Sequence, residues 1–341
     1  MTMKHDTPPG PLPVGVIGTG RMGRLHARTY AKMPQVKLVG VYDMNADSAS
    51  DVAGEFNAQP FSDLGELLSH VSAVTIATPT VTHLEMARAC LSRGVPCLIE
   101  KPLAKDSAEG RQIVELAREH KTLVQVGHIE RFNPAVRAMD RLGVRAGFIE
   151  VTRISPLTFR SIDVGVVLDM MIHDIDIVLK LARSPVARID AVGVSVIGGH
   201  EDICNARLTF ANGCVANVTA SRLALKTERK LRVFSSESYL SVDYQKRFGV
   251  VVRRTGNLDA IREAAESIRR GDVADASGLN YTDLLQVEEL QISDTEPLRA
   301  QLDAFVSSVR NGTPPEVTVE DGLAAVETAV RIVQAIAPQK L

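Results

Sequence analysis

The sequence predicts an α/β protein in which an N-terminal, doubly wound parallel sheet is followed by an α+β part with an open, mainly antiparallel sheet. Three observations lead to this prediction. Short apolar runs alternate with helical patterns in the first half, a glycine-rich turn follows the first run, and strand-like runs succeed one another closely in the second half. The 341 residues are enough for two domains of ordinary size.

The first half is built of strands that are joined by helices. After a polar, proline-rich leader over residues 1–13, the apolar runs predict strands at 14–18, 36–42, 71–77, 96–99 and 122–126. Helical spacing of apolar residues predicts helices at 21–32, after Asp43, at 83–92 and at 107–120. Helical crossovers make neighbouring strands parallel, so residues 14–127 are expected to form the first domain.

The second half, residues 128–341, is expected to form the α+β domain. Helices are predicted at 135–142, 167–181, 297–311 and 320–335, and strands at 148–154, 189–196, 205–210, 214–221, 230–235, 239–243 and 249–254. The turn at 211–213 has the composition of a hairpin. The basic run 226–232 is interpreted as a solvated strand edge, and the charged segment 258–280 receives no role.

Composition excludes several classes of function. Lys and Arg number 39 and Asp and Glu 41, a formal charge of -2, so neither nucleic acid nor a membrane surface is an expected partner. The four cysteines have neither zinc-ligand spacing nor the pattern of a disulfide framework. No apolar run approaches the length of a membrane span. We therefore expect a cytoplasmic protein with reduced thiols and no metal.

A glycine-rich turn connects the first predicted strand to the first predicted helix. Its six residues fit the pattern G-x-G-x-x-G: Gly18, Thr19, Gly20, Arg21, Met22 and Gly23. Between a strand and a helix, this pattern is typical of a dinucleotide site, where the pyrophosphate binds at the helix N-terminus. Asp43 follows about 20 residues further on, where a carboxylate binds the ribose hydroxyls and disfavours a 2′-phosphate. The motif therefore predicts NAD rather than NADP; the alternative is a turn without a ligand.

Asp169 and His173 lie four positions apart in an apolar, predicted helix, so both side chains are expected on one face. A carboxylate that orients an imidazole is suited to general base catalysis. The alternative is a partly exposed polar stripe. A metal site with Asp174 and Asp176 is disfavoured, because neighbouring side chains diverge on a helix.

Lys101 lies between Glu100 and Pro102, directly after the predicted strand 96–99. Ligands of open α/β sheets bind at the carboxyl ends of the strands, so this lysine is well placed to reach the reactive end of a cofactor. The alternative is an ordinary turn with a solvated lysine.

Together these motifs resemble the Gfo/Idh/MocA family of sugar and cyclitol oxidoreductases. The resemblance depends on four motifs: the glycine motif followed by His26, residues 77–79 followed by His83, residues 100–104, and the pattern Asp169-x-x-x-His173. It implies a Rossmann domain, a second domain whose open sheet forms a homodimer or homotetramer, and Lys101 and His173 meeting at the substrate hydroxyl. It also implies cofactor contacts from Ala77, Thr78, Pro79, His83, Glu100 and Lys101.

Three further segments, 127–135, 153–156 and 163–169, are similar to the UDP-N-acetylglucosamine 3-dehydrogenases within that family. The similarity implies a nucleotide-sugar substrate that is oxidised at a secondary alcohol. Its diphosphate would accept hydrogen bonds from residues near the cleft: Arg131, Asn133, Arg153 and Arg160. Ion pairs at the surface or between the domains are the alternative role for these arginines. The competing functions are oxidation of a free sugar or an inositol, and a non-catalytic NAD-binding regulator.

Overall fold

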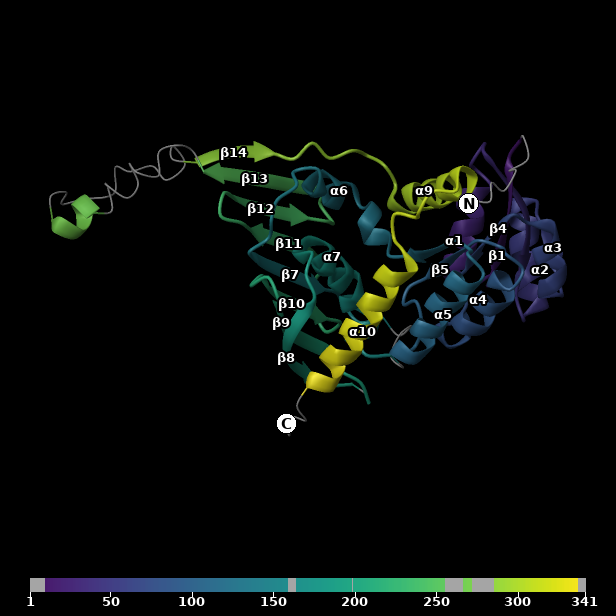
Figure 1. The fold of residues 1–341 in the computed structure, drawn as a ribbon, viewed down its shortest axis with the longest axis horizontal. Coiled ribbons are helices and arrows are strands. Elements are labelled where there is room, and N and C mark those ends of the chain that lie inside the picture. Colours follow the sequence, from purple (N-terminus) through teal and green to yellow (C-terminus); the bar gives the residue numbers. More distant parts are fainter. Residues whose placement is uncertain (1–9, 159–163, 198, 255–265, 272–284, 337–341) are drawn as a thin grey trace.

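The computed structural model describes residues 10–158, 164–197, 199–254, 266–271 and 285–336. Two sheets organise this part of the chain (Figure 1). Arg160, most of the predicted leader and most of the charged segment 258–280 lie outside the described residues.

The first sheet has six parallel strands in the order β3-β2-β1-β4-β5-β6, which confirms the predicted doubly wound sheet. Its strands are β1 (Leu12–Ile17), β2 (Val36–Tyr42), β3 (Gln59–Phe61), β4 (Ala73–Ile76), β5 (Cys97–Glu100) and β6 (Val124–Gly127). Every residue of β4, β5 and β6 is buried, as expected for strands covered on both faces. The short strand β3 was not predicted.

Helices cover both faces of this sheet. They are α1 (Arg21–Tyr30), α2 (Ala46–Phe56), α3 (Leu64–His70), α4 (His83–Leu91) and α5 (Ser107–Glu119), with a 3-10 turn η1 (Thr80–Thr82) before α4. Leu12, Val14 and Val16 of β1 pack against α1 and α2. A helix from the far end of the chain, α9 (Pro297–Asn311), joins the same cluster through Leu302 and Phe305. The first core is therefore completed by residues from outside 14–127, and the domain limits stay a prediction.

The second sheet has eight strands in the order β14-β13-β12-β11-β7-β10-β9-β8, antiparallel except for the parallel pair β7 and β10. Its strands are β7 (Phe148–Ile154), β8 (Val186–Val194), β9 (Ile203–Phe210), β10 (Val215–Ser221), β11 (Glu228–Phe234), β12 (Ser238–Asp243), β13 (Phe248–Arg254) and β14 (Leu285–Glu289). Strand β11 lies between β7 and β12, so the prediction of a strand edge at 226–232 is wrong.

The remaining helical elements pack on the second sheet or join it to the first. They are η2 (Ile129–Phe132), α6 (Pro134–Asp140), η3 (Val167–Met171), α7 (Ile172–Ala182) and α10 (Val319–Ala335). Helix α10 contacts α5 and β6 on one side and α7 and β8 on the other, and it crosses between the two sheets (Figure 1). Along β7, buried and partly exposed residues alternate, so only the face toward the helices is closed. Oligomerisation through the open face stays a prediction.

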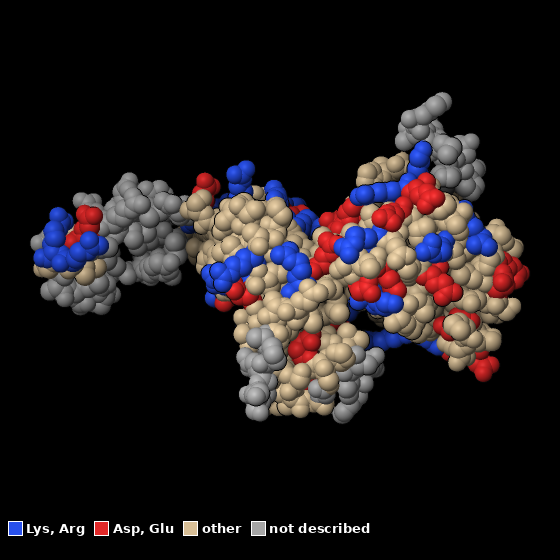
Figure 2. Space-filling view, turned by 60° about the horizontal axis from the view of Figure 1, so that its bottom comes forward, with Lys and Arg blue, Asp and Glu red and all other residues tan. Residues whose placement is uncertain are grey.

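The surface agrees with the balanced composition. On the face in Figure 2, acidic and basic side chains are interspersed over the helices of the first sheet. Among the described residues, none of the helices combines the length and apolarity needed to cross a bilayer. All four cysteines are free and buried.

Candidate functional site

The glycine turn has the shape that a dinucleotide requires. Gly18 has a φ of +92° and packs on the backbone of Ala77 and Thr78, which follow β4. A Cβ on Gly23 would lie 1.8 Å from the Gly18 carbonyl oxygen, so only glycine permits this approach of helix and strand. Gly20 faces open space, and no side chain caps the helix α1 that follows it. The free amides of α1 therefore fit a pyrophosphate.

Asp43 follows β2 beside this turn. Its carboxylate accepts hydrogen bonds from the Thr19 main-chain nitrogen at 2.7 Å, the Thr19 hydroxyl at 3.0 Å and the Asn45 nitrogen at 2.9 Å. Burial acts to raise the pKa of Asp43, but these hydrogen bonds outweigh it and lower the pKa below its ordinary value. Asp43 is thus an ionised carboxylate that anchors the glycine turn, a role that the sequence motif did not indicate. Its contact with a ribose stays a prediction.

His83 links two loops at the carboxyl edge of the first sheet. It is 1% exposed, and its Nδ1 lies 3.0 Å from the Pro102 carbonyl while its Nε2 lies 3.0 Å from the Thr78 carbonyl. Both ring nitrogens are occupied by main-chain oxygens, which leaves neither for a cofactor. His83 therefore joins the loop after β4 to the loop that carries Lys101, and its contact with a cofactor stays a prediction.

Glu100 is also turned inward. Its Oε1 lies 3.0 Å from Nε2 of His26, and its side chain is 10% exposed. Burial acts to raise the pKa of Glu100, but His26 and Lys101 lower it, so the carboxylate is ionised. This buried contact between α1 and the end of β5 helps to fix the start of the Lys101 side chain. A cofactor contact of Glu100 finds no support in this arrangement.

Lys101 connects the two sheets at the centre of the predicted site. Its ammonium donates to the Asp169 carbonyl oxygen at 2.7 Å and to the Asp169 Oδ1 at 3.3 Å. The exposed fractions of the two side chains are 21% and 30%, so the pair remains open to a small molecule. The structure thereby brings together two residues that are 68 positions apart.

Asp169 does not orient His173 as the sequence predicted. The predicted helix over 167–181 is divided into the π-helical turn η3, which holds Asp169, and α7, which begins at Ile172. Because the chain is wound more widely in a π turn, the spacing rule of an α-helix does not apply across it. Among the described residues the Asp169 carboxylate has its contact with Lys101 and makes no hydrogen bond with His173.

His173 lies beside this pair and is partly buried. Its Nδ1 is buried without a hydrogen-bond partner among the described residues. Burial, and then the positive charges of Lys101 and Arg153, lower the pKa of His173 well below 6.5. The imidazole is therefore neutral near neutral pH and able to accept a proton.

Arg131 and Arg153 bind protein carboxylates. Arg131 donates from Nε and Nη2 to Asp176 at 2.6 and 2.7 Å. Arg153 donates from Nε and Nη2 to Asp174 at 2.6 and 2.9 Å, and from Nη1 to Glu130 at 3.0 Å. All of these side chains are buried, and a buried charge requires a partner of opposite sign. These hydrogen bonds argue against a role of both arginines as diphosphate ligands, and that role stays a prediction.

The side chain of Asn133 also forms hydrogen bonds within the protein. Its Nδ2 donates to Glu130 at 3.0 Å and its Oδ1 accepts from the Ala135 nitrogen as the N-cap of α6. Arg160, the fourth predicted substrate ligand, lies outside the described residues. Within the described part of the chain, no cluster of three His, Cys, Asp or Glu residues has a geometry that holds a metal ion.

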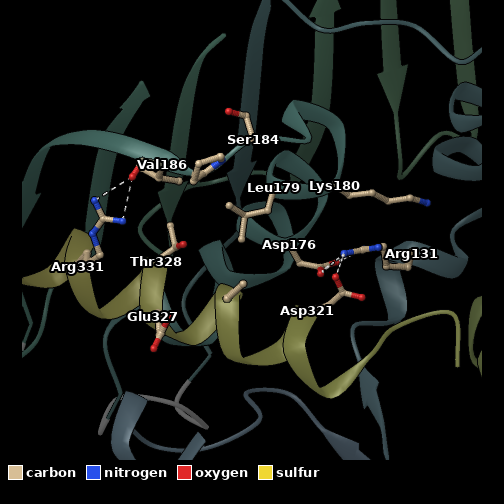
Figure 3. Close-up of a pocket in the computed structure, with 12 residues that line it drawn as sticks. Arg131, Asp176, Leu179, Lys180, Ser184, Val186, Asp321, Glu327, Thr328 and Arg331 are labelled. Atoms are coloured by element: carbon tan, nitrogen blue, oxygen red, sulfur yellow. Dashed lines mark hydrogen bonds and ion pairs between the residues drawn. The ribbon is translucent and has the colours of Figure 1, made fainter. Parts of the chain in front are cut away.

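A separate cavity of about 400 Å³ lies between α7, α10 and the start of β8 (Figure 3). Arg131, Asp176 and Asp321 lie at one end of it, and Arg331 donates to the Val186 carbonyl at the other. Neither Lys101 nor His173 lines it. This cavity is therefore distinct from the place where Lys101 meets Asp169.

Sequence reasoning missed the contribution of β11. Arg229 stands opposite Arg153 in the register of β11 with β7, and its Nη1 lies 3.7 Å from Glu130. The sequence contains a signal for the position of Arg229. Leu231 and Val233 are apolar and lie two and four residues after it, so all three side chains are expected on the same face of the strand. The basic composition of 226–232 hid this alternation.

Comparisons with known proteins agree with this geometry. Residues 12–128 match a family model described as an oxidoreductase family with an NAD-binding Rossmann fold, and residues 155–241 match a GFO/IDH/MocA C-terminal domain. A UDP-N-acetylglucosamine 3-dehydrogenase from Acidithiobacillus ferrooxidans is 40% identical over 231 residues, which cover 67% of this chain and 73% of that protein. An inositol 2-dehydrogenase from Rhizobium meliloti is 26% identical over 96% of this chain and 97% of its own.

A solved structure extends the similarity to the whole fold. That of the UDP-N-acetylglucosamine 3-dehydrogenase GnnA from Acidithiobacillus ferrooxidans has a TM-score of 0.85 at 31% identity, and covers 95% of this chain and 97% of that one.

Proposed function

The chain belongs to the Gfo/Idh/MocA family of NAD-binding oxidoreductases, and from this premise we propose that it oxidises the 3-hydroxyl of UDP-N-acetylglucosamine to a ketone. The observation that carries the proposal is the Lys101 ammonium held by Asp169 beside a neutral, partly buried His173. The choice of substrate is supported by the name of the relative that is 40% identical.

The proposed chemistry divides the hydroxyl proton and the carbon-bound hydrogen between two acceptors. Bound NAD supplies the acceptor for the hydride from the alcohol carbon. His173 accepts the hydroxyl proton, because its lowered pKa keeps the imidazole in the basic form. Lys101 donates a hydrogen bond to the substrate oxygen as negative charge develops there. Asp169 holds Lys101 in place through its main-chain and side-chain oxygens, a role that replaces the predicted orientation of His173.

The cofactor would lie along the carboxyl edge of the first sheet. The open amides after Gly20 suit the pyrophosphate, and the ionised Asp43 has lone pairs left for ribose hydroxyls. A 2′-phosphate would meet the negative charge of Asp43, which is why we propose a preference for NAD.

A direct assay tests the proposed function. Purified protein with NAD would be given UDP-N-acetylglucosamine, N-acetylglucosamine and myo-inositol in parallel, and NADH formation would be followed by absorbance. We expect the highest kcat/KM for the nucleotide sugar. Higher efficiency with the free sugar or the inositol would overturn the substrate assignment, and no reduction of NAD with any sugar or cyclitol would favour the non-catalytic regulator.

A further inference from the structure

Among the described residues, one arginine at the site differs from its neighbours because it has no close counter-ion of its own. Arg229 lies on β11, whose register places it opposite Arg153 of β7. Leu231 and Val233, at the same parity, are buried against the helices, so Arg229 projects from the covered face of the sheet. Arg232 has the opposite parity and pairs with Glu150.

Arg153 and Arg229 differ in how completely protein carboxylates pair with them. Arg153 is 4% exposed, and its guanidinium is hydrogen bonded to Asp174 and Glu130. Arg229 is 46% exposed. Within the described part of the chain its nearest carboxylate oxygen, 3.7 Å away, is the Glu130 oxygen that already accepts from Arg153 at 3.0 Å. Like charges directly opposite on neighbouring strands repel each other, and one shared carboxylate compensates them only in part. Burial and the charge of Arg153 accordingly lower the pKa of Arg229.

This end of the sheet borders the catalytic groups. Ser155, which directly follows β7, contacts the Met170 sulfur at 3.8 Å, and Met170 is next to Asp169 in η3. Asp174, which binds Arg153, is next to His173. The charge of Arg229 is close enough to contribute to the lowered pKa of His173. An anion that enters beside Lys101 would therefore find a half-exposed guanidinium within the same site.

We propose that Arg229 binds the diphosphate of the nucleotide sugar and thereby selects a phosphorylated substrate over a free sugar; this inference rests on the proposed function. A guanidinium presents paired N–H donors whose geometry matches phosphate oxygens. The phosphate would supply the counter-charge that Glu130 shares with Arg153. Arg229 thus takes the role that the sequence had assigned to Arg131 and Arg153.

The test compares Arg229→Ala and Arg229→Gln with Arg232→Ala, a matched control from the open face of the same strand. Steady-state kinetics with UDP-N-acetylglucosamine and with N-acetylglucosamine, and inhibition by UDP, would be measured at saturating NAD. Loss of one charge-assisted contact held equally in the ground and transition states should raise KM for the nucleotide sugar and the UDP inhibition constant about ten- to a hundredfold, with kcat changed little. The control should leave both constants unchanged.

The possible results distinguish a failure of the role of Arg229 from a failure of the proposed function. If wild-type protein oxidises UDP-N-acetylglucosamine but both Arg229 variants keep its KM and the UDP inhibition constant, Arg229 is not a phosphate ligand and the proposed function stands. An equal rise in KM for N-acetylglucosamine would overturn the inference too, since a free sugar has no phosphate to lose. If wild-type protein oxidises no nucleotide sugar, the proposed function fails and the inference fails with it. Arg229→Gln retains hydrogen-bonding capacity, so it keeps the test valid if Arg229→Ala unfolds.

Discussion

Replacement of either Arg131 or Asp176 should lower the free energy of unfolding without weakening substrate binding. The two side chains are 7% and 1% exposed and share two short hydrogen bonds, so the loss of one partner leaves a buried charge unpaired. Such losses cost about 3–5 kcal/mol. After Asp176→Leu, Arg131 still has Asp321 at 3.8 Å, so we expect the lower end of this range, ~3 kcal/mol.

Arg131→Met should be the more costly change. Asp176 has no second ion-pair partner among the described residues, so its unpaired carboxylate should cost the upper part of the range, ~4–5 kcal/mol. The double variant Arg131→Met/Asp176→Leu removes both charges and should recover to within ~2 kcal/mol of wild type. Urea unfolding monitored by circular dichroism measures all three free energies, and KM for the nucleotide sugar should stay within about twofold in each variant. An unchanged unfolding midpoint together with a tenfold higher KM for Arg131→Met would refute this reasoning and restore Arg131 as a substrate ligand.

Three other predictions concern the cofactor and the chemistry. Gly23→Ala should abolish NAD binding in calorimetry, because the added Cβ would overlap the Gly18 carbonyl. The control Gly54→Ala, at a position that faces open space in α2, should bind NAD normally and raise the free energy of unfolding by up to ~1 kcal/mol. Normal NAD binding by Gly23→Ala would contradict the proposed pyrophosphate site at the glycine turn. Lys101→Met and His173→Asn should each lower the single-turnover rate of hydride transfer by ~10² or more while NAD affinity is kept; an unchanged rate in His173→Asn would exclude His173 as the base. The wild-type pH profile of kcat/KM should decline on the acid side only below pH 6.5, because the imidazole must be neutral to act, and an acid-side midpoint above 6.5 would contradict the lowered pKa of His173. Asp43→Ser should narrow the preference for NAD over NADP, measured as the ratio of the two dissociation constants, and an unchanged ratio would show that Asp43 serves only the glycine turn.

The order of strands and helices in the first half follows directly from the sequence, because fully buried parallel strands are nearly continuous apolar runs. The exceptions have physical causes. Strand β3 has three residues and contains Pro60, so it carries no periodic signal. The π turn η3 was missed because a period of 3.6 was assumed across 167–181, and that assumption also paired Asp169 with the wrong residue.

Side-chain partners were the least predictable part of the site. Arg153 and Asp174 are 21 positions apart, and Arg131 and Asp176 are 45 apart, so nothing local indicates that these arginines are neutralised inside the fold. The composition around an arginine cannot distinguish a paired guanidinium from one that awaits a ligand. Alternation along a strand indicates only the face on which the arginine lies. Arg153 follows buried Ile149 and Val151, and Arg229 precedes buried Leu231 and Val233, so both are on the covered face although only Arg153 is fully paired.

The packing of α9 on the first sheet has a consequence for folding during synthesis. Leu298, Leu302 and Phe305 fill the cluster that also holds Leu12 and Val14, and they are separated from those residues by almost the whole length of the chain. A ribosome delivers these residues only after both sheets have been made, so part of one apolar face of the first sheet stays uncovered during synthesis of the second. A nascent chain that exposes only residues up to Gly127 outside the ribosome should accordingly recruit chaperones, and one that also exposes α9 up to Asn311 should release them.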